Sequence, residues 1–102
     1  MTGGAPIDVD VPHQLGRAEA RRRMESGFGR LADWIPGGAV SEHRWDGDSL
    51  HFTVSAMGQR VAARLDVAED KVHAHLDLPA FLGMLAGPLR DKLKEKGPEL
   101  LR

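Results

Sequence analysis

The 102-residue chain carries 14 Lys and Arg residues against 15 Asp and Glu residues, so its formal net charge at pH 7 is -1. This balance gives no general attraction to nucleic acids or anionic membranes, and we expect neither as a partner. The absence of cysteine excludes disulfides, thiolate nucleophiles and Cys-ligated metal centres. No stretch approaches the roughly 20 apolar residues of a membrane span. We expect a cytoplasmic protein with a flexible segment at 1–6 and one domain over 7–102.

The first expected element is a short strand. Apolar residues alternate with acidic ones from Ile7 to Val11, and Pro12 stops the pattern. Alternation with a period of two is typical of a strand with one face on a core. The proline favours a position at the edge of a sheet or at the end of a strand.

A helix is predicted next. Gly16 can serve as its N-cap, with Glu19 three positions later, and an apolar stripe follows at helical spacing. Gly27 and Gly29 weaken the second half, which must be held by packing or become irregular. Pro36-Gly37-Gly38 is expected to end the helix. The apolar stripe consists of Ala20, Met24, Phe28, Leu31 and Ile35.

Residues 42–51, EHRWDGDSLH, admit two interpretations, a metal site or a turn. His43, Asp46, Asp48 and His51 are all plausible ligands. However, Asp-Gly favours a two-residue type I′ turn, which would place Trp45 opposite Asp48 and His43 opposite Leu50. In that register His43 and His51 lie on opposite faces of a hairpin, and Trp45 lies on the apolar side. We therefore predict a turn.

The chain then continues as a meander. A turn near Gly58-Gln59 leads to an alternating segment that ends at Val67, and a turn around Ala68 to Lys71 leads to another that ends at Leu78. Together with the hairpin, these segments predict four strands that share one apolar face.

The last segment, from Pro79, predicts a helix that covers this face. Pro88 lies inside the pattern, so we expect a kink or a new helical start after Gly87, and Gly97-Pro98 is expected to end the regular helix. The predicted architecture is a two-layer α+β fold with element order β-α-β-β-β-β-α, in which two helices pack on one face of an antiparallel sheet. The apolar stripe of this helix consists of Leu82, Leu85, Leu89 and Leu93, with Phe81 and Met84 beside it.

Two histidines form a better metal candidate than the hairpin. His73 and His75 would point to one side of a strand, with Asp77 two residues further on and His51 as a ligand across the sheet. Two ligands on an open face rarely make a site, so we predict neither a metal nor another cofactor. No serine lies in G-x-S-x-G and no glycine-rich phosphate loop precedes a helix, so we predict a protein that is not an enzyme and has no catalytic residues.

Two surfaces are candidates for partner binding. Arg17 and Arg21 belong to a basic helix face, which is most often solvated but could contact an acidic protein surface. Aromatic residues make up only 5% of the chain, which disfavours nucleic-acid stacking. The C-terminal helix either closes the core, leaves a pocket, or offers an apolar surface together with Leu100-Leu101. Its candidate surface residues are Phe81, Met84, Leu85 and Leu89.

Three segments carry a family resemblance. Residues 11–23 (VPHQLGRAEARRR), 45–52 (WDGDSLHF) and 78–93 (LPAFLGMLAGPLRDKL) resemble, in order and spacing, the small bacterial family of putative polyhydroxyalkanoic acid system proteins. The matching positions are His13, Leu15, Gly16, Trp45, Gly47, Asp48, Phe52, Leu82, Gly83, Leu85, Gly87 and Pro88.

The resemblance implies a function in polyhydroxyalkanoate storage. We expect a non-enzymatic accessory protein that binds a granule surface or a granule-associated protein, in the cytoplasm and in association with granules. The alternative is a carrier of a small apolar ligand, an acyl chain or hydroxy acid, with a pocket between the sheet and the C-terminal helix. The sequence does not specify the oligomeric state.

Overall fold

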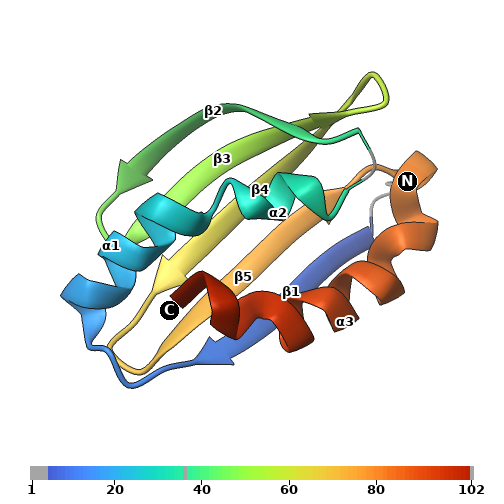
Figure 1. Ribbon diagram of the computed structural model, residues 1–102. Coiled ribbons are helices and arrows are strands. Elements are labelled where there is room, and N and C mark those ends of the chain that lie inside the picture. The colour runs from blue at the N-terminus through green and yellow to red at the C-terminus, as the bar shows by residue number, and fades with distance from the viewer. Residues whose placement is uncertain (1–4, 36, 102) are drawn as a thin grey trace.

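The computed structural model describes residues 5–35 and 37–101, apart from the side chains of Ala5, Phe81 and Leu82. Its centre is a five-stranded antiparallel sheet with the strand order β1-β5-β4-β3-β2 (Figure 1). The predicted α+β class and meander are confirmed. The first strand begins at Ala5, two residues before the predicted domain start. The strands are β1 (Ala5–Pro12), β2 (Ala39–Asp46), β3 (Ser49–Ala56), β4 (Gln59–Val67) and β5 (Lys71–Leu78).

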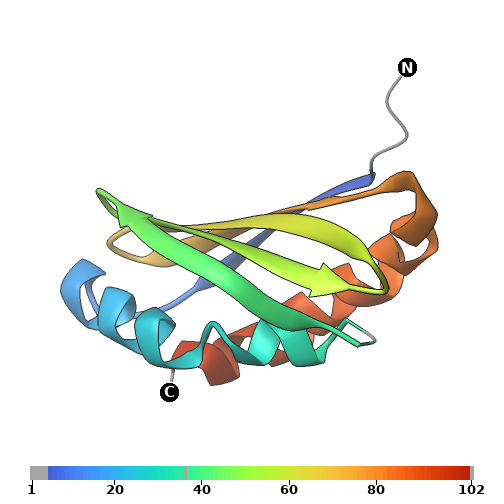
Figure 2. The ribbon, with the colours of Figure 1, turned by 90° about the horizontal axis from the view of Figure 1, so that it is seen from above.

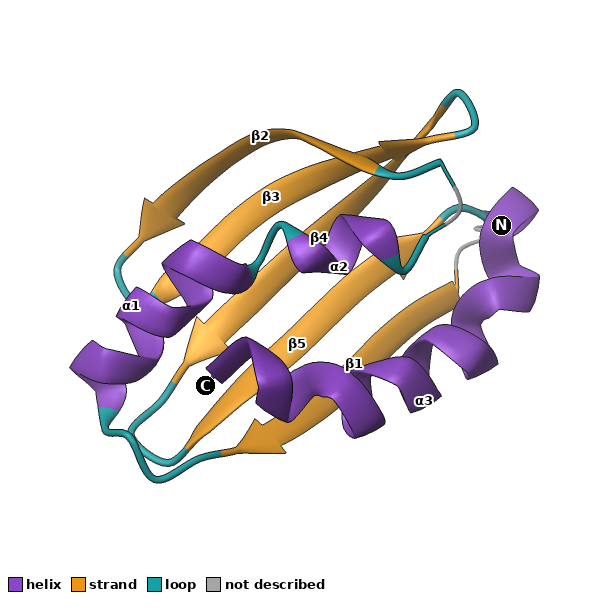
Figure 3. Ribbon diagram, in the orientation of Figure 1, coloured by secondary structure: helices purple, strands orange, loops and turns teal. Residues whose placement is uncertain are grey.

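In the part of the chain that the structure describes, the helices all lie on one side of the sheet and leave its other side uncovered (Figures 2 and 3). Among the described residues, no helix combines the length and apolar character needed to cross a bilayer. The layered arrangement leaves one broad sheet face available for contacts. The helical elements are α1 (Arg17–Gly27), α2 (Arg30–Asp33), the 3₁₀ helix η1 (Ala80–Leu85), α3 (Ala86–Lys96) and the 3₁₀ helix η2 (Gly97–Leu101).

The core lies between the sheet and the helices. Alternate residues of β1, β3, β4 and β5 are buried, as their period of two predicted. Leu89 and Leu93 of α3 are buried as well, and α3 packs mainly on β1. Leu100 and Leu101 are also buried, so the C-terminal leucines close the core and form no apolar surface.

The first helix is interrupted where its glycines are. α1 ends at Gly27, and α2 begins at Arg30, so the predicted irregularity is confirmed. Packing explains why Gly27 is accommodated, because a Cβ there would lie 3.2 Å from the backbone oxygen of Leu100. The glycine lets η2 approach α1 closely.

The C-terminal segment changes helix type before its proline. The expected new start after Gly87 occurs earlier, at Ala86, where η1 passes into α3. Pro88 therefore falls in the first turn of α3, where a backbone N–H has no partner within the helix and its loss costs little. α3 ends at Lys96, as Gly97-Pro98 predicted.

The two edges of the sheet differ in how they are protected. β1 carries Pro6 near its start and Pro12 at its end, which confirms the edge position that Pro12 favoured. β2 has a β-bulge, because its register with β3 shifts between Val40 and Glu42. Proline and a bulge both hinder pairing with a further strand.

Candidate functional site

The hairpin at 42–51 turns one residue later than predicted. Asp46 pairs with Ser49, and Trp45 pairs with Leu50, so the two turn residues are Gly47 and Asp48. The predicted pairing of Trp45 with Asp48 is wrong. Gly47 has a φ of 62°, whereas Asp48 has no left-handed φ. A positive φ at the first turn residue alone matches a type II′ turn, which favours Gly in that place.

The faces of the hairpin survive this correction, because the register moves by an even number of residues. Trp45 lies on the inner side beside Leu50, and His43 lies opposite Phe52 on the same side. The ring of His43 is 4.9 Å from that of Phe28. His51 faces the uncovered side, so the two histidines cannot share a metal ion.

A polar cluster ties α1 to this hairpin. The Asp48 carboxylate lies 3.4 Å from Arg17 Nε and 3.7 Å from Arg21 Nη1. The Arg21 guanidinium also lies over the ring of Trp45, and the indole N–H of Trp45 donates to Glu25. The arginines predicted to bind a partner therefore already have an intramolecular partner.

His13 joins the β1–α1 loop to the β4–β5 turn. Its Nε2 lies 3.2 Å from the carbonyl oxygen of Ala68, and its Nδ1 accepts a hydrogen bond of 3.1 Å from the backbone N–H of Leu15. The first of these contacts connects the β1–α1 loop to the β4–β5 turn. The imidazole is thus occupied by two backbone groups, which indicates a structural role.

On the uncovered face, two histidines and three carboxylates alternate in space. We call Asp8, Asp10, His73, His75 and Asp77 the His–Asp ladder. His73 contacts Asp10 through Nδ1 at 2.6 Å and Asp8 through Nε2 at 2.9 Å. His75 contacts Asp8 through Nδ1 at 2.7 Å and Asp77 through Nε2 at 3.1 Å. The ladder joins β1 to β5 along their outer side.

The ladder shifts the pKa values of His73, Asp8 and Asp10. Hydrogen bonding to Asp10, and then to Asp8, raises the pKa of His73 above 6.5 and outweighs the effect of desolvation. Hydrogen bonds from His75 and His73 lower the pKa of Asp8 below 3.8, and the bond from His73 lowers the pKa of Asp10. The two carboxylates beside His73 therefore favour the charged form of its imidazole.

The predicted metal ligands His73 and His75 point to one side as expected, but their ring nitrogens contact carboxylates of the ladder. His73 and His75 lie on the same side, with Asp77, whereas His51 lies two strands away on β3. Within residues 5–35 and 37–101, no group of three or more His, Asp or Glu side chains is placed to hold a metal ion.

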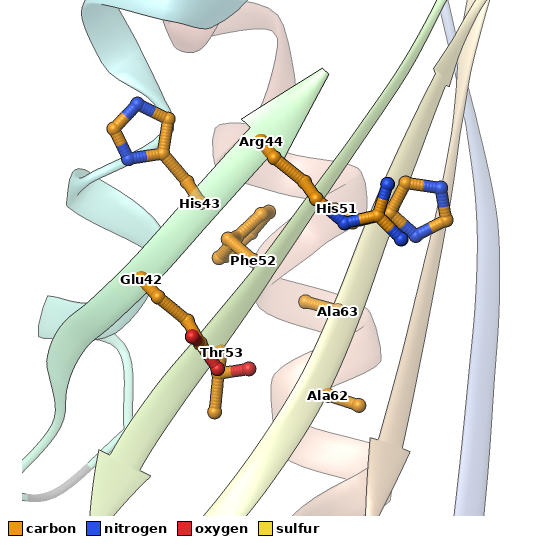
Figure 4. Close-up of a pocket in the computed structure, with 8 residues that line it drawn as sticks. All are labelled: Glu42, His43, Arg44, His51, Phe52, Thr53, Ala62 and Ala63. Atoms are coloured by element: carbon orange, nitrogen blue, oxygen red, sulfur yellow. The ribbon is translucent and has the colours of Figure 1, made fainter. Parts of the chain in front are cut away.

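The uncovered face also has a hollow, which opens over β3 and β4 (Figure 4). Its volume is about 300 Å³. A smaller hollow of about 140 Å³ adjoins it, and both are lined by His51, Ala62 and Ala63. A further open hollow lies between α1 and Trp45. The remaining residues that line the first hollow are Glu42, His43, Arg44, Phe52 and Thr53.

Comparison with known protein families gives a match that covers most of the chain. Residues 7–101 match the model of a family described as putative polyhydroxyalkanoic acid system protein (PHA_gran_rgn). The chain belongs to this family. Searches of curated proteins and of solved structures found no match. The family description links the chain to the polyhydroxyalkanoic acid system, and the resemblance seen in the sequence is confirmed.

Four of the motif positions that carry the family resemblance have structural roles. His13 joins two loops, while Trp45 and Asp48 hold α1 against the hairpin. Phe52 belongs to the core. Contacts that build the fold thus account for these motif residues, and a binding surface has to be sought among other side chains.

The residues predicted to form an apolar surface differ in their exposure to solvent. Met84 is 84% exposed, Leu85 is partly buried, and Leu89 is buried at 4%. The side chain of Phe81 lies outside the described residues. Only Met84 of the described candidates therefore presents a large apolar surface.

The pocket expected beneath the C-terminal helix receives no support. Gly97 lies against Val11, and a Cβ on the glycine would be 2.8 Å from Val11 Cγ2. The hollows described above lie elsewhere, on the uncovered face and beside Trp45.

Sequence reasoning missed Met57. This side chain is 51% exposed at the turn between β3 and β4. The turn had been expected one residue later, near Gly58-Gln59, which would have placed Met57 inside a strand. A large apolar residue beside a glycine between two alternating segments is the signal that could have revealed it.

Proposed function

We propose that this protein is a non-enzymatic accessory protein of the polyhydroxyalkanoate system and contacts the granule surface directly. The observation that carries this proposal is the location of Met57 and Met84. Within the part of the chain that the structure describes, they are the large hydrophobic side chains classed as exposed.

Both methionines belong to elements at the same end of the molecule. Met57 lies in the β3–β4 turn and Met84 in η1, and these elements lie at one end in both orthogonal views (Figures 1 and 2). Methionine is flexible and polarizable, so it adapts to an irregular apolar surface. Two such side chains at one end suit contact with an apolar polyester.

The backbone at Met57 supports a functional reason for this residue. Met57 has a φ of 52° and Gly58 a φ of 76°, the two positive values of a type I′ turn. Asn, Asp and Gly are preferred at the first of these places, and a left-handed conformation costs other residues about 1–2 kcal/mol. A strained, exposed methionine is explained if its side chain gains an apolar contact elsewhere.

The charged outer side of α3 indicates that the granule surface is contacted through the end of the molecule that carries Met57 and Met84, and not along this helix. Leu89 and Leu93 face the core, so the apolar stripe of α3 is already used. The exposed side of this helix is charged and would remain in water. Its exposed charged residues include Arg90, Asp91, Lys92, Lys94 and Glu95.

Pairing of polar side chains supports a non-enzymatic role. Ser49 Oγ lies 2.5 Å from Asp66 Oδ1, and the histidines of the His–Asp ladder contact carboxylates. A serine nucleophile is activated by an adjacent histidine or amine, and within the described residues Ser49 is hydrogen-bonded to a carboxylate and to no histidine.

Co-sedimentation with polyester particles tests the proposal. Wild-type protein is expected to sediment with protein-free particles, and Met57→Asn and Met84→Asn are each expected to bind about tenfold more weakly, equivalent to losing roughly 1.4 kcal/mol of apolar burial. Ser26→Asn, at an exposed position of α1, is the matched control and should bind like wild type.

Native granules provide the second arm of this experiment. If the wild type sediments with native granules but not with protein-free particles, the partner is a granule-associated protein and direct surface contact is wrong. Unchanged binding by both methionine variants would also contradict the proposal.

A further inference from the structure

The strand register places outward-facing side chains in straight rows across the sheet. Arg44 pairs with His51, His51 with Arg64, and Arg64 with His75. We call Arg44, His51, Arg64 and His75 the basic row. The adjacent outward row is lower at its centre, because it consists of Glu42, Thr53, Ala62 and Asp77.

The lower row forms the floor of a furrow across the strands. Ala62 contributes only a methyl group and is exposed, and Thr53 beside it is short. The hollows of about 300 Å³ and about 140 Å³ share His51, Ala62 and Ala63, so they are parts of one furrow that reaches from β2 to β5. Neighbouring strands lie about 4.8 Å apart, which gives a length of roughly 14 Å between the first and the fourth.

The walls of the furrow offer donors, and its floor offers methyl groups. Figure 4 shows Arg44 extending across β3 toward His51, and Glu42 extending toward Thr53. Arginine has only donors, and a histidine ring has at least one. A ligand that fits has acceptor oxygens along one side and small alkyl groups along the other.

We propose that this furrow binds a short hydroxyalkanoate chain, the linear ester of hydroxy acids. Its ester carbonyl oxygens accept hydrogen bonds from Arg44, His51 and Arg64, and its alkyl branches lie on Ala62 and Thr53. This inference rests on the proposed role at the polyester granule, since it names a ligand of the same chemistry.

An ester chain suits the basic row better than an extended peptide does. A peptide carries an N–H for every carbonyl and needs acceptors as well as donors, whereas an ester has no N–H. The carboxylate acceptors at the furrow, Glu42 and Asp77, lie at its two ends, on β2 and β5, rather than along its centre. A terminal carboxylate of the ligand would pair best with Arg44, because Arg64 Nε already lies 3.0 Å from Asp66.

The furrow is open to water, so binding is expected to be weak. Exposed charged hydrogen bonds contribute little, and we expect a Kd on the order of 1 mM. NMR detects binding in this range and reports where it occurs.

Titration of ¹⁵N-labelled protein with the linear trimer of 3-hydroxybutyric acid tests the inference. Shifts are expected at His51, Thr53 and Ala62, and they should saturate. Ala62→Leu fills the furrow from an exposed position, and Arg44→Gln removes a donor, so each is expected to weaken binding at least about fivefold, as steric exclusion and loss of a charged donor predict. Ala39→Leu is the matched control, since Ala39 is exposed on β2 outside the furrow.

Three outcomes would overturn the inference: no saturable shifts, shifts confined to other elements, or equal affinity in Ala62→Leu and Ala39→Leu. An acidic peptide that binds the furrow more tightly than the trimer would show that the ligand class is wrong. The same variants are also tested for co-sedimentation. If the wild type sediments with particles but does not bind the trimer, only the proposed ligand site in the furrow is wrong. If it binds the trimer but does not sediment, only the proposed contact with the granule surface is wrong.

Discussion

Arg21 lies over the indole ring of Trp45, with its guanidinium carbon 4.4 Å from the ring centroid. Arg21 comes from α1 and Trp45 from the end of β2, so this contact holds the first helix against an edge of the sheet. Asp48, in the following turn, lies 3.7 Å from the same guanidinium. One arginine thus links a helix, a strand and a turn.

Replacing this arginine should destabilise the protein. Arg21→Gln is expected to lower the free energy of unfolding by about 1 kcal/mol, because it removes the cation–π contact and the charge beside Asp48. Arg22→Gln, on a side chain that is 75% exposed, should change it by no more than a few tenths of a kcal/mol. Urea unfolding of both variants measures the difference, and equal effects would contradict the assigned role.

Relief of backbone strain at Met57 should stabilise the protein. Met57→Asn is expected to raise the free energy of unfolding by about 1 kcal/mol, because asparagine tolerates the left-handed conformation better. Met84→Asn provides the comparison, since no such strain exists there. Thermal unfolding of the two variants measures this. A stabilised variant that binds granules more weakly would separate binding from folding.

The His–Asp ladder should make the stability contribution of His73 depend on pH. Its pKa is raised by Asp10 and Asp8, so its contribution is fully present below the ordinary value of 6.5 and is lost as the pH rises through the folded-state pKa. The pKa values of Asp8 and Asp10 are lowered, so their contribution is present above 3.8 and is lost as the pH falls. The stabilising contributions of His73 and of the two aspartates are therefore present together between pH 3.8 and pH 6.5.

His73→Gln should accordingly be more destabilising near pH 6 than at pH 8. Urea unfolding at the two pH values measures this, and NMR titration should show a lower pKa for His73 in Asp10→Asn than in the wild type. A destabilisation that is the same at both pH values would show that packing, rather than charge, explains the effect.

Two glycines form a matched pair for alanine substitution. At Gly38 a Cβ would collide with the carbonyl oxygen of Ala32, a backbone atom that cannot move aside. At Gly29 a Cβ meets nothing within 4 Å, and φ is -60°. We expect Gly38→Ala to destabilise by about 2 kcal/mol or more through overpacking. Gly29→Ala should stabilise by about 0.5–1 kcal/mol through reduced entropy of the unfolded chain. Opposite shifts in melting temperature would confirm this, and shifts of the same sign would contradict it.

The faces of the sheet could be predicted from the sequence because alternation requires no knowledge of distant contacts. The register of the first hairpin could not. Asp46-Gly47 and Gly47-Asp48 are both good turn dipeptides, and local preference does not decide between them. The contacts of Asp48 with Arg17 and Arg21 accompany the observed turn, and these join residues far apart in sequence.

The candidate binding surfaces were harder to predict for a related reason. Alternation shows that Ala62 faces outward, but the furrow depends on which residues of four strands lie side by side. That order became visible only in the strand pairing. The exposure of Met57 was missed because it depends on the position of one turn, to within a single residue.

The protected edges of the sheet bear on how this protein behaves when many copies crowd together. Unpaired strand edges can join copies into fibres. Here the bulge of β2 interrupts one edge, and Pro6 and Pro12 remove backbone donors from the other. Pairing of strands between copies is therefore hindered at both edges, even at high local density.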